Sequence, residues 1–262
     1  MTAAKVLRYE LQDLRRSRWV FGYALLLFAL TDAVLRFGGG GPRALVSLLN
    51  VALVLVPLVS IVFGTMYLYG ARDFIELLLA QPVRRSQLCA GLYAGLAVPL
   101  TLAFVLGVGL PFLWEGWGEG AVAGPLAMLL GVGVLLTLVF TALAFLVSLV
   151  FDDRARGFGA ALLLWLAATA LYDAVLVFVA TAWSDYPLEA PLLALTLLNP
   201  VDLGRVLLLL RLDTAALLGY TGAVFERFFG SAQGIAIAGA ALLAWCAIPL
   251  GLAARRFQRK DF

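Results

Sequence analysis

The sequence alternates between long apolar runs and short polar segments from one end to the other. A helix of about 20 residues crosses the hydrocarbon core of a bilayer, and the longer runs reach that length. Because no polar block large enough for a soluble domain interrupts the pattern, we expect residues 1–262 to form one all-α integral membrane domain. The predicted spans cover about residues 19–37, 44–69, 88–113, 121–151, 158–183 and 231–252.

Residues 1–18 differ from the spans because they mix cations with apolar residues at helical spacing. Val6, Leu7, Leu11 and Leu14 fall on one helical face, between basic residues. This pattern predicts an amphipathic entry helix that lies on the bilayer surface and leads into the first span.

A polar island at residues 71–87 separates the second and third predicted spans. A simple turn would need only about five residues. Residues 76–80 are expected to form a short helix, which Gln81 and Pro82 end because the residue before a proline avoids αR geometry. We interpret the island as a coupling element on the cytoplasmic side of the membrane.

Residues 184–230 raise the question of a seventh span. The run 192–212 is apolar enough for one, but Asn199 is placed to cap a helix that begins at Pro200. A seventh span would also put the basic segment 255–260 outside, whereas cytoplasmic segments are normally the basic ones. We therefore expect six spans, both termini in the cytoplasm, and an outer cap of short interfacial or re-entrant helices over 184–230.

Composition excludes several functions for this chain. It has no histidine, which removes the commonest general base and metal ligand. Its lysines, Lys5 and Lys260, cannot complete a G-x-x-x-x-G-K-[ST] phosphate loop. Cys89 and Cys246 lie far apart inside apolar runs and are expected to be structural thiols. We expect no catalytic residue, metal site or cofactor on this chain, and no nucleic-acid binding, because the cations flank apolar runs as topology signals do.

Short motifs resemble those of a known family. Residues 8–19 (RYELQDLRRSRW) resemble the entry helix of permease subunits of type-2 ATP-binding-cassette (ABC) exporters, and residues 75–84 (IELLLAQPVR) are similar to their coupling-helix motif. Within that family the likeness is closest to NosY-type permeases, which are associated with maturation of the copper enzyme nitrous-oxide reductase. Residues 160–173 resemble their fifth span and residues 198–202 (LNPVD) their outer segment. The resemblance implies six spans per subunit, a permease dimer and two separate ATPase subunits docked beneath it.

The polar island supplies the first set of candidate functional residues. A short helix with fixed ends can transmit ATPase closure to the spans. The alternative is a solvated turn whose arginines only set topology. The residues expected to dock the ATPase are Asp73, Glu76, Gln81, Pro82, Arg84 and Arg85.

A second set of candidate functional residues lies later in the sequence, from the fifth predicted span onward. Asp173 is a carboxylate inside the fifth predicted span, where a lone charge is costly, so with Tyr172 it is assigned to a translocation path or gate. The alternative is a structural hydrogen bond through Thr169 or Tyr172. Asp32 is expected to pair with Arg36, four residues on, and needs no functional role. The residues assigned to contact with an outer partner are Asn199, Pro200, Asp202 and Arg205.

The resulting functional hypothesis is a permease subunit in a bacterial inner membrane. It would couple ATP hydrolysis on a separate ABC ATPase, which holds ATP and Mg²⁺, to export or to maturation of an extracytoplasmic metalloenzyme. Its expected partners are the ATPase, a second permease copy, a periplasmic accessory protein and the lipid bilayer. Two rivals remain, a membrane anchor that transports nothing and, ranked lower, a polytopic lipid-modifying enzyme, which would need convergent acid–base or metal groups.

The scarcity of soft ligands bears on the cargo. A copper conduit needs thiolate, thioether or imidazole groups, and beyond the initiator the chain offers two separate cysteines, Met66 and Met128. We therefore expect copper not to cross through ligands of this subunit. A sulfur species, a lipid-like cargo, or force applied to an outer partner through residues 184–230 fits the composition better.

Overall fold

The computed structural model describes residues 18–38, 41–80, 84–115, 123–183, 189–212, 228 and 231–260. Within these ranges all regular structure is helical, which confirms the predicted fold class. The predicted entry helix at 1–18 lies, except for Arg18, outside the described residues. The helices are α2 (Arg18–Phe37), α3 (Gly41–Gly70), α4 (Arg72–Leu79), α5 (Arg85–Glu115), α6 (Ala123–Val150), α7 (Arg154–Leu166), the π-helix η1 (Ala167–Leu171), α8 (Tyr172–Ala182), α9 (Glu189–Leu197), α10 (Pro200–Arg211) and α12 (Ala232–Arg259).

Six helical stretches of the described chain are long and apolar enough to cross a membrane, as the sequence predicts. The fifth, Arg154–Ala182, is composed of α7, η1 and α8. Pro191–Leu197 and Pro200–Leu210 would count as a seventh span only if joined, and they meet at an angle of 111°. These residues therefore form a bent pair rather than a straight span.

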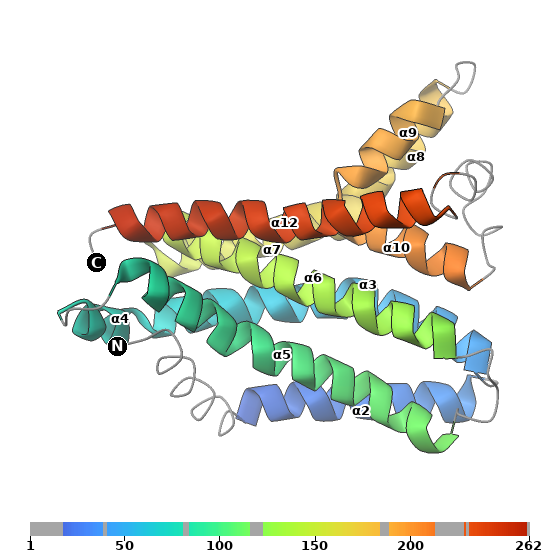
Figure 1. Cartoon of the computed structure of the whole chain (residues 1–262), viewed down its shortest axis with the longest axis horizontal. Coiled ribbons are helices and arrows are strands. Elements are labelled where there is room, and N and C mark those ends of the chain that lie inside the picture. Colours follow the sequence, from blue (N-terminus) through green and yellow to red (C-terminus); the bar gives the residue numbers. More distant parts are fainter. Residues whose placement is uncertain are drawn as a thin grey trace.

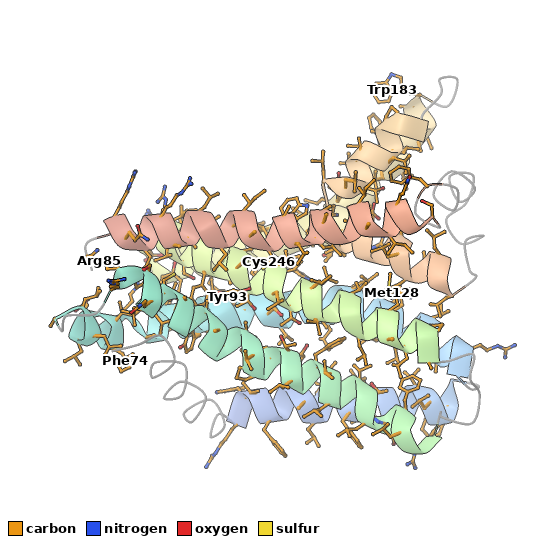
Figure 2. The ribbon with its side chains drawn as sticks, viewed as in Figure 1. Phe74, Arg85, Tyr93, Met128, Trp183 and Cys246 are labelled. Carbon is orange, nitrogen blue, oxygen red and sulfur yellow. The ribbon has the colours of Figure 1, made fainter. Side chains whose placement is uncertain are left out.

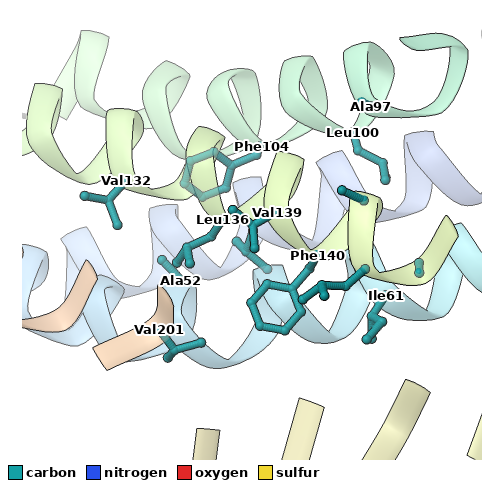
Figure 3. Close-up of a cluster of buried hydrophobic side chains, with 14 of the residues drawn as sticks. Ala52, Ile61, Ala97, Leu100, Phe104, Val132, Leu136, Val139, Phe140 and Val201 are labelled. Carbon is teal, nitrogen blue, oxygen red and sulfur yellow. The ribbon is translucent and has the colours of Figure 1, made fainter. Parts of the chain in front are cut away.

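Helix α6 forms the centre of the bundle and packs against α3, α5, α10 and α12. Its buried residues include Leu136 and Phe140, which belong to the same buried cluster as Phe104 of α5 (Figure 3). Phe104 lies directly over Gly133 of α6, where a larger residue would collide with the ring. Such small-residue positions let helices approach closely where lipid gives no hydrophobic drive for their association.

The two ends of the bundle differ in shape (Figure 1). Helix α4 and the C-terminal end of α12 lie at one end. At the other, α8 and α9 project away from the remaining helices, and α10 returns along the bundle. Helix α8 has no buried residue, and the whole fifth span has an exposed apolar surface suited to lipid or to another protein.

Candidate functional site

Helix α4 presents one face to the bundle and the opposite face outward. Ile75 is 0% exposed and Leu78 is buried beside it, whereas Leu77 is 69% exposed and Phe74 is also exposed (Figure 2). The helix begins at Arg72, four residues before the predicted start, because the Ala71 carbonyl accepts a hydrogen bond from the Ile75 amide at 2.8 Å and so opens the first turn there. The structure therefore offers a rigid helix with an exposed apolar ridge.

Four of the six docking candidates are among the residues that the structure describes. Asp73 and Glu76 are exposed on α4, on the same outward side as Leu77. Arg84 is exposed just before α5, and Arg85 is half-buried at its start. Gln81 and Pro82 lie outside the described residues, so their docking role stays a prediction.

Arg72 links α4 to the turn between α6 and α7. Its guanidinium donates to the Asp152 carbonyl at 2.8 Å and to the Phe151 carbonyl at 3.4 Å, and it lies 4.5 Å from the centre of the Tyr69 ring. The Tyr69 hydroxyl donates to the same Phe151 carbonyl at 2.8 Å. Asp153 then caps α7, because its carboxylate accepts from the Arg156 amide at 2.7 Å. Thus the turn that starts the fifth span is held directly by the first residue of α4.

Arg85 and Lys260 connect the same end of the bundle to α12. Arg85 donates to the Lys260 carbonyl at 2.6 Å, and the Lys260 ammonium lies 2.6 Å from the Asp152 carboxylate. This hydrogen-bonded cation lowers the pKa of Asp152 below its ordinary value of 3.8, with Arg72 and Arg256 acting in the same direction. The sequence pattern identified Arg72 and Lys260 only as cations beside apolar runs and gave Asp152 no role beyond a polar turn between two spans. Their positions at span ends were the available clue, but nothing local indicated their mutual contacts.

The second candidate region lies where α8 and α10 meet. Arg205 of α10 donates to the Asp173 carboxylate of α8 at 2.7 Å and lies 3.6 Å from Asp202 on its own helix. Asp202 is only 7% exposed at its side chain, whereas Asp173 and Arg205 are about one-third and one-quarter exposed. The structure therefore joins residues that the sequence had placed in two separate sites.

The alternative partners suggested for Asp173 are engaged elsewhere. Thr169 donates to the Trp165 carbonyl at 2.8 Å, and the Tyr172 hydroxyl donates to the Leu195 carbonyl of α9. Tyr172 therefore links α8 to α9, next to the ion pair that links α8 to α10.

Asn199 behaves as predicted and also makes a contact that was not predicted. Its side-chain oxygen accepts from the Val201 amide at 3.0 Å, and α10 begins at Pro200, which confirms the predicted cap. Its side-chain amide donates to the Ala168 carbonyl of η1 at 2.7 Å. A π-helix displaces carbonyls from the regular helical pattern and is frequently found at functional positions. One buried residue thus starts α10 and attaches it to the irregular part of the fifth span.

Two other predictions concern residues away from these two regions. Asp32 and Arg36 form the expected pair on α2, with 3.0 Å between the carboxylate and the guanidinium. In the ranges that the structure describes, His, Cys, Asp and Glu residues do not gather into a group of three that could hold a metal ion.

These features define a multi-pass helical membrane protein with an exposed amphipathic helix at one end and a charged helix pair toward the other. Residues 44–262 match the family model described as ABC-2 family transporter protein, and the chain belongs to this family. It is 28% identical to the probable ABC transporter permease protein NosY of Pseudomonas aeruginosa, over 97% of both chains. It is also 28% identical to the protein of the same name from Stutzerimonas stutzeri, again over 97% of both. The family resemblance predicted from the sequence is confirmed, and membership implies an ABC ATPase partner.

Proposed function

We propose that this chain is the membrane-embedded permease subunit of an ABC transporter and that α4 is the helix through which a separate ATPase moves it. The single observation that supports this most is the outward ridge of α4. Leu77 is exposed on the face of α4 opposite the buried Ile75, and Phe74 is exposed beside the buried Leu78, so the helix presents apolar groups outward while Ile75 and Leu78 fix it in the bundle. An exposed apolar anchor between carboxylates, here Asp73 and Glu76, is suited to a protein partner with an apolar pocket and a basic rim.

The charge distribution supports a cytoplasmic location for this end of the bundle. Arg84, Arg154, Arg156, Arg255 and Arg256 are all exposed near α4, the α6–α7 turn or the end of α12. Cytoplasmic loops of membrane proteins are enriched in such cations. We accordingly place α4 and the C-terminus in the cytoplasm of a bacterial cell, with the chain in the inner membrane. ATP and Mg²⁺ would be held by the partner, and this chain would contribute force transmission rather than catalysis.

The region around Asp173 would act as a gate toward the outer side. Tyr172 and Asp173 lie at the start of α8, and their contacts reach α9 and α10 respectively. Asn199, Pro200, Asp202 and Arg205 would hold α10 in place and present the bent α9–α10 pair to an outer partner. In a low-dielectric region an ion pair is a discrete element that is either made or broken, which suits a two-state gate.

The resemblance to NosY-type permeases, a name that both relatives carry, suggests the kind of system that this chain serves. We infer that the transporter serves maturation of an extracytoplasmic metalloenzyme by supporting assembly of its copper or sulfur site. A conduit for copper would need soft ligands. Cys89 is buried in the bundle and Cys246 lies on a different helix, so a sulfur species, a lipid-like cargo or force on a periplasmic partner fits the chain better. A second permease copy would cover the exposed face of the fifth span.

Co-purification with the ATPase tests the docking role of α4. The unaltered chain and the variants Leu77→Asp and Glu76→Ala are each co-expressed with the ATPase and purified in mild detergent, and the amounts of bound ATPase are compared. Both substitutions are on the exposed face of α4, so we expect the protein to fold and the amount of bound ATPase to fall by at least tenfold for Leu77→Asp. Arg156→Ala, an exposed change on α7, is the control and should bind normally. Equal binding by all variants would contradict docking through α4 and would favour a non-transporting anchor.

A further inference from the structure

At the end of the bundle that carries α4, the chain from Arg72 to Arg85 and the contacts that link these two residues through Asp152 and Lys260 together form a ring. Three cations take part, Arg72, Arg85 and Lys260, and each donates to main-chain carbonyls at or just beyond the end of another helix. The last carbonyls of an α-helix have no partner within the helix and carry the negative end of its dipole. The cations therefore bind where the helices themselves leave acceptors unsatisfied.

The first part of the ring joins α4 to α6 and α7. Arg72, the first residue of α4, donates to the carbonyls of Phe151 and Asp152, directly after the end of α6. Tyr69, in the last turn of α3, donates to Phe151 and packs so closely against Gly157 of α7 that a side chain there would collide with its ring. The N-terminal flank of α4 is thus fixed to the start of the fifth span.

The second part passes through Lys260, directly after α12. Its ammonium lies 2.6 Å from the Asp152 carboxylate and donates to the Leu149 carbonyl in the last turn of α6 at 3.3 Å. The Lys260 side chain is only 17% exposed, whereas that of Asp152 is 83% exposed. A cation largely withdrawn from water depends on such partners, so Lys260 has a defined position rather than a free one.

The third part closes the ring through Arg85. Its guanidinium donates to the carbonyls of Gln258 at 3.2 Å and Lys260 at 2.6 Å, at the end of α12 (Figure 2). Arg85 is the first residue of α5 and follows the polar island. Arg72, the first residue of α4, and Arg85, the first residue of the next helix, are therefore both held by the end of α12. Arg85 contacts it directly, and Arg72 is linked to it through Asp152.

We propose that the end of α12, with Lys260 as its central contact, is a strap that holds α4 against the bundle and passes its displacement to α7 and α12. Helix α4 has eight residues and two buried apolar anchors, Ile75 and Leu78. A helix so short is marginal alone, so its position depends on what fixes its ends. The strap rests on the proposed function in one respect: the ATPase is what displaces α4. Lys260 and Arg85 are positioning residues for the docking helix.

Distance measurement on the chain alone tests the strap. Nitroxide labels at Leu77→Cys on α4 and Leu252→Cys on α12 are placed on exposed sites, in a Cys89→Ala, Cys246→Ala background in lipid nanodiscs. Pulsed electron resonance should give one narrow distance distribution. Lys260→Met should add a broad second population, and Asp152→Asn, a change at an exposed carboxylate, should add it as well. Lys260→Arg should keep the narrow distribution because the arginine retains a positive charge at this position.

The control and a second readout separate the strap from general destabilisation and from docking. Arg255→Met removes an exposed cation of α12, five residues before Lys260, and should leave the distribution narrow. With the ATPase present, Lys260→Met should still co-purify with it but lose most of the stimulation of ATP hydrolysis. An unchanged distribution in both Lys260→Met and Asp152→Asn would overturn the strap. Failure of the unaltered chain to bind ATPase would instead overturn the proposed docking function, leaving the distance result to decide the strap.

Discussion

Arg205 and Asp173 are separated by 32 positions in the chain, yet their side chains meet at 2.7 Å and join α10 to α8. Asp202, one turn before Arg205, lies 3.6 Å from the same guanidinium. One arginine therefore serves two carboxylates, and either carboxylate can retain it if the other moves away. In the proposed gate, Asp202 would stay beside Arg205 on the same helix while the contact with Asp173 is broken and remade.

A double-mutant cycle on Asp173→Asn and Arg205→Gln should reveal a coupling between the two side chains. Removing one partner of a half-buried charged pair costs about 1–3 kcal/mol because the other group is left unsatisfied. The loss from the double variant should be smaller than the sum of the two single losses by about 1 kcal/mol or more. Thermal unfolding in detergent measures each variant.

The pair Asp32–Arg36 provides the matched control for that cycle. It is a local i,i+4 pair on α2 with a more exposed arginine. Its coupling should be no more than about 0.5 kcal/mol, as for exposed helical pairs. Additive losses for Asp173 and Arg205 would show that their contact does not stabilise the junction of α8 and α10.

Substitutions of Asn199 should separate its two contacts. Asn199→Ser keeps an oxygen that can cap α10 but is too short to reach the Ala168 carbonyl. Asn199→Ala removes both contacts, at about 1 kcal/mol for the cap and about 1 kcal/mol for the hydrogen bond. We expect the unfolding temperature to fall in the order Asn, Ser, Ala. If Asn199→Ser were as stable as the unaltered chain, the contact with η1 would have no energetic role.

Two glycines on α5 should respond differently to the same change. A side-chain carbon at Gly107 would lie 2.7 Å from the Cβ of Leu27 and 2.9 Å from the Ala24 carbonyl oxygen of α2. Gly107→Ala should therefore push α2 away from α5 and cost about 1–3 kcal/mol. Gly109→Ala, whose nearest neighbour is a Leu130 methyl at 3.9 Å, is the control. Equal unfolding temperatures for the two variants would contradict close packing of α2 on α5.

The ion pair of Asp152 with Lys260 should give a defined pH dependence. Lys260 lowers the pKa of the Asp152 carboxyl in the folded chain, with contributions from Arg72 and Arg256, while Asp153 is the neighbouring acid. Because the folded-state pKa is the lower one, the stabilisation is complete above the ordinary value of 3.8 and is lost as the pH falls through the folded value. The unaltered chain should have a higher unfolding temperature than Asp152→Asn at pH 7. The difference should shrink as the pH falls below 3.8 and disappear below the folded-state pKa. The exposure of Asp152 keeps the effect small and sensitive to salt; a constant difference across this range would exclude the ion pair as its source.

The fold could be predicted largely because its dominant constraint is local. Apolar runs must be helical in lipid, so the spans appear in the sequence pattern itself. Capping is local too, and the pair of Asn199 and Pro200 correctly indicated where α10 begins. The start of α4 was placed four residues too late, and the contact of its first residue, Arg72, with a turn some 80 residues away could not be predicted. Such distant contacts have no periodic signal.

Some residues of the candidate sites could likewise be identified from the local sequence pattern, and others only from the folded structure. Glu76 and Arg84 could be chosen from their place in a polar island, but the exposed ridge at Leu77 required the helix to be oriented against the bundle. Asp173 was conspicuous as an isolated charge in an apolar run, whereas its partner Arg205 was identified only by the folded arrangement. Lys260 was counted as a basic residue near a span, and its near-burial required the tertiary structure.

The π-helix at Ala167–Leu171 has a consequence for the alignment of the fifth span. Each residue advances an α-helix by about 100°, so accommodating one additional residue rotates everything that follows relative to what precedes it. Trp165, before the π-helix, faces α3 and donates to the Val54 carbonyl, while α8 beyond it leaves the bundle. Removing a single residue from Ala167–Leu171 would bring α8 back into phase with α7 and turn Asp173 away from Arg205. Chain length at this point, and not only side-chain chemistry, therefore determines which residues the outer half of the span can meet.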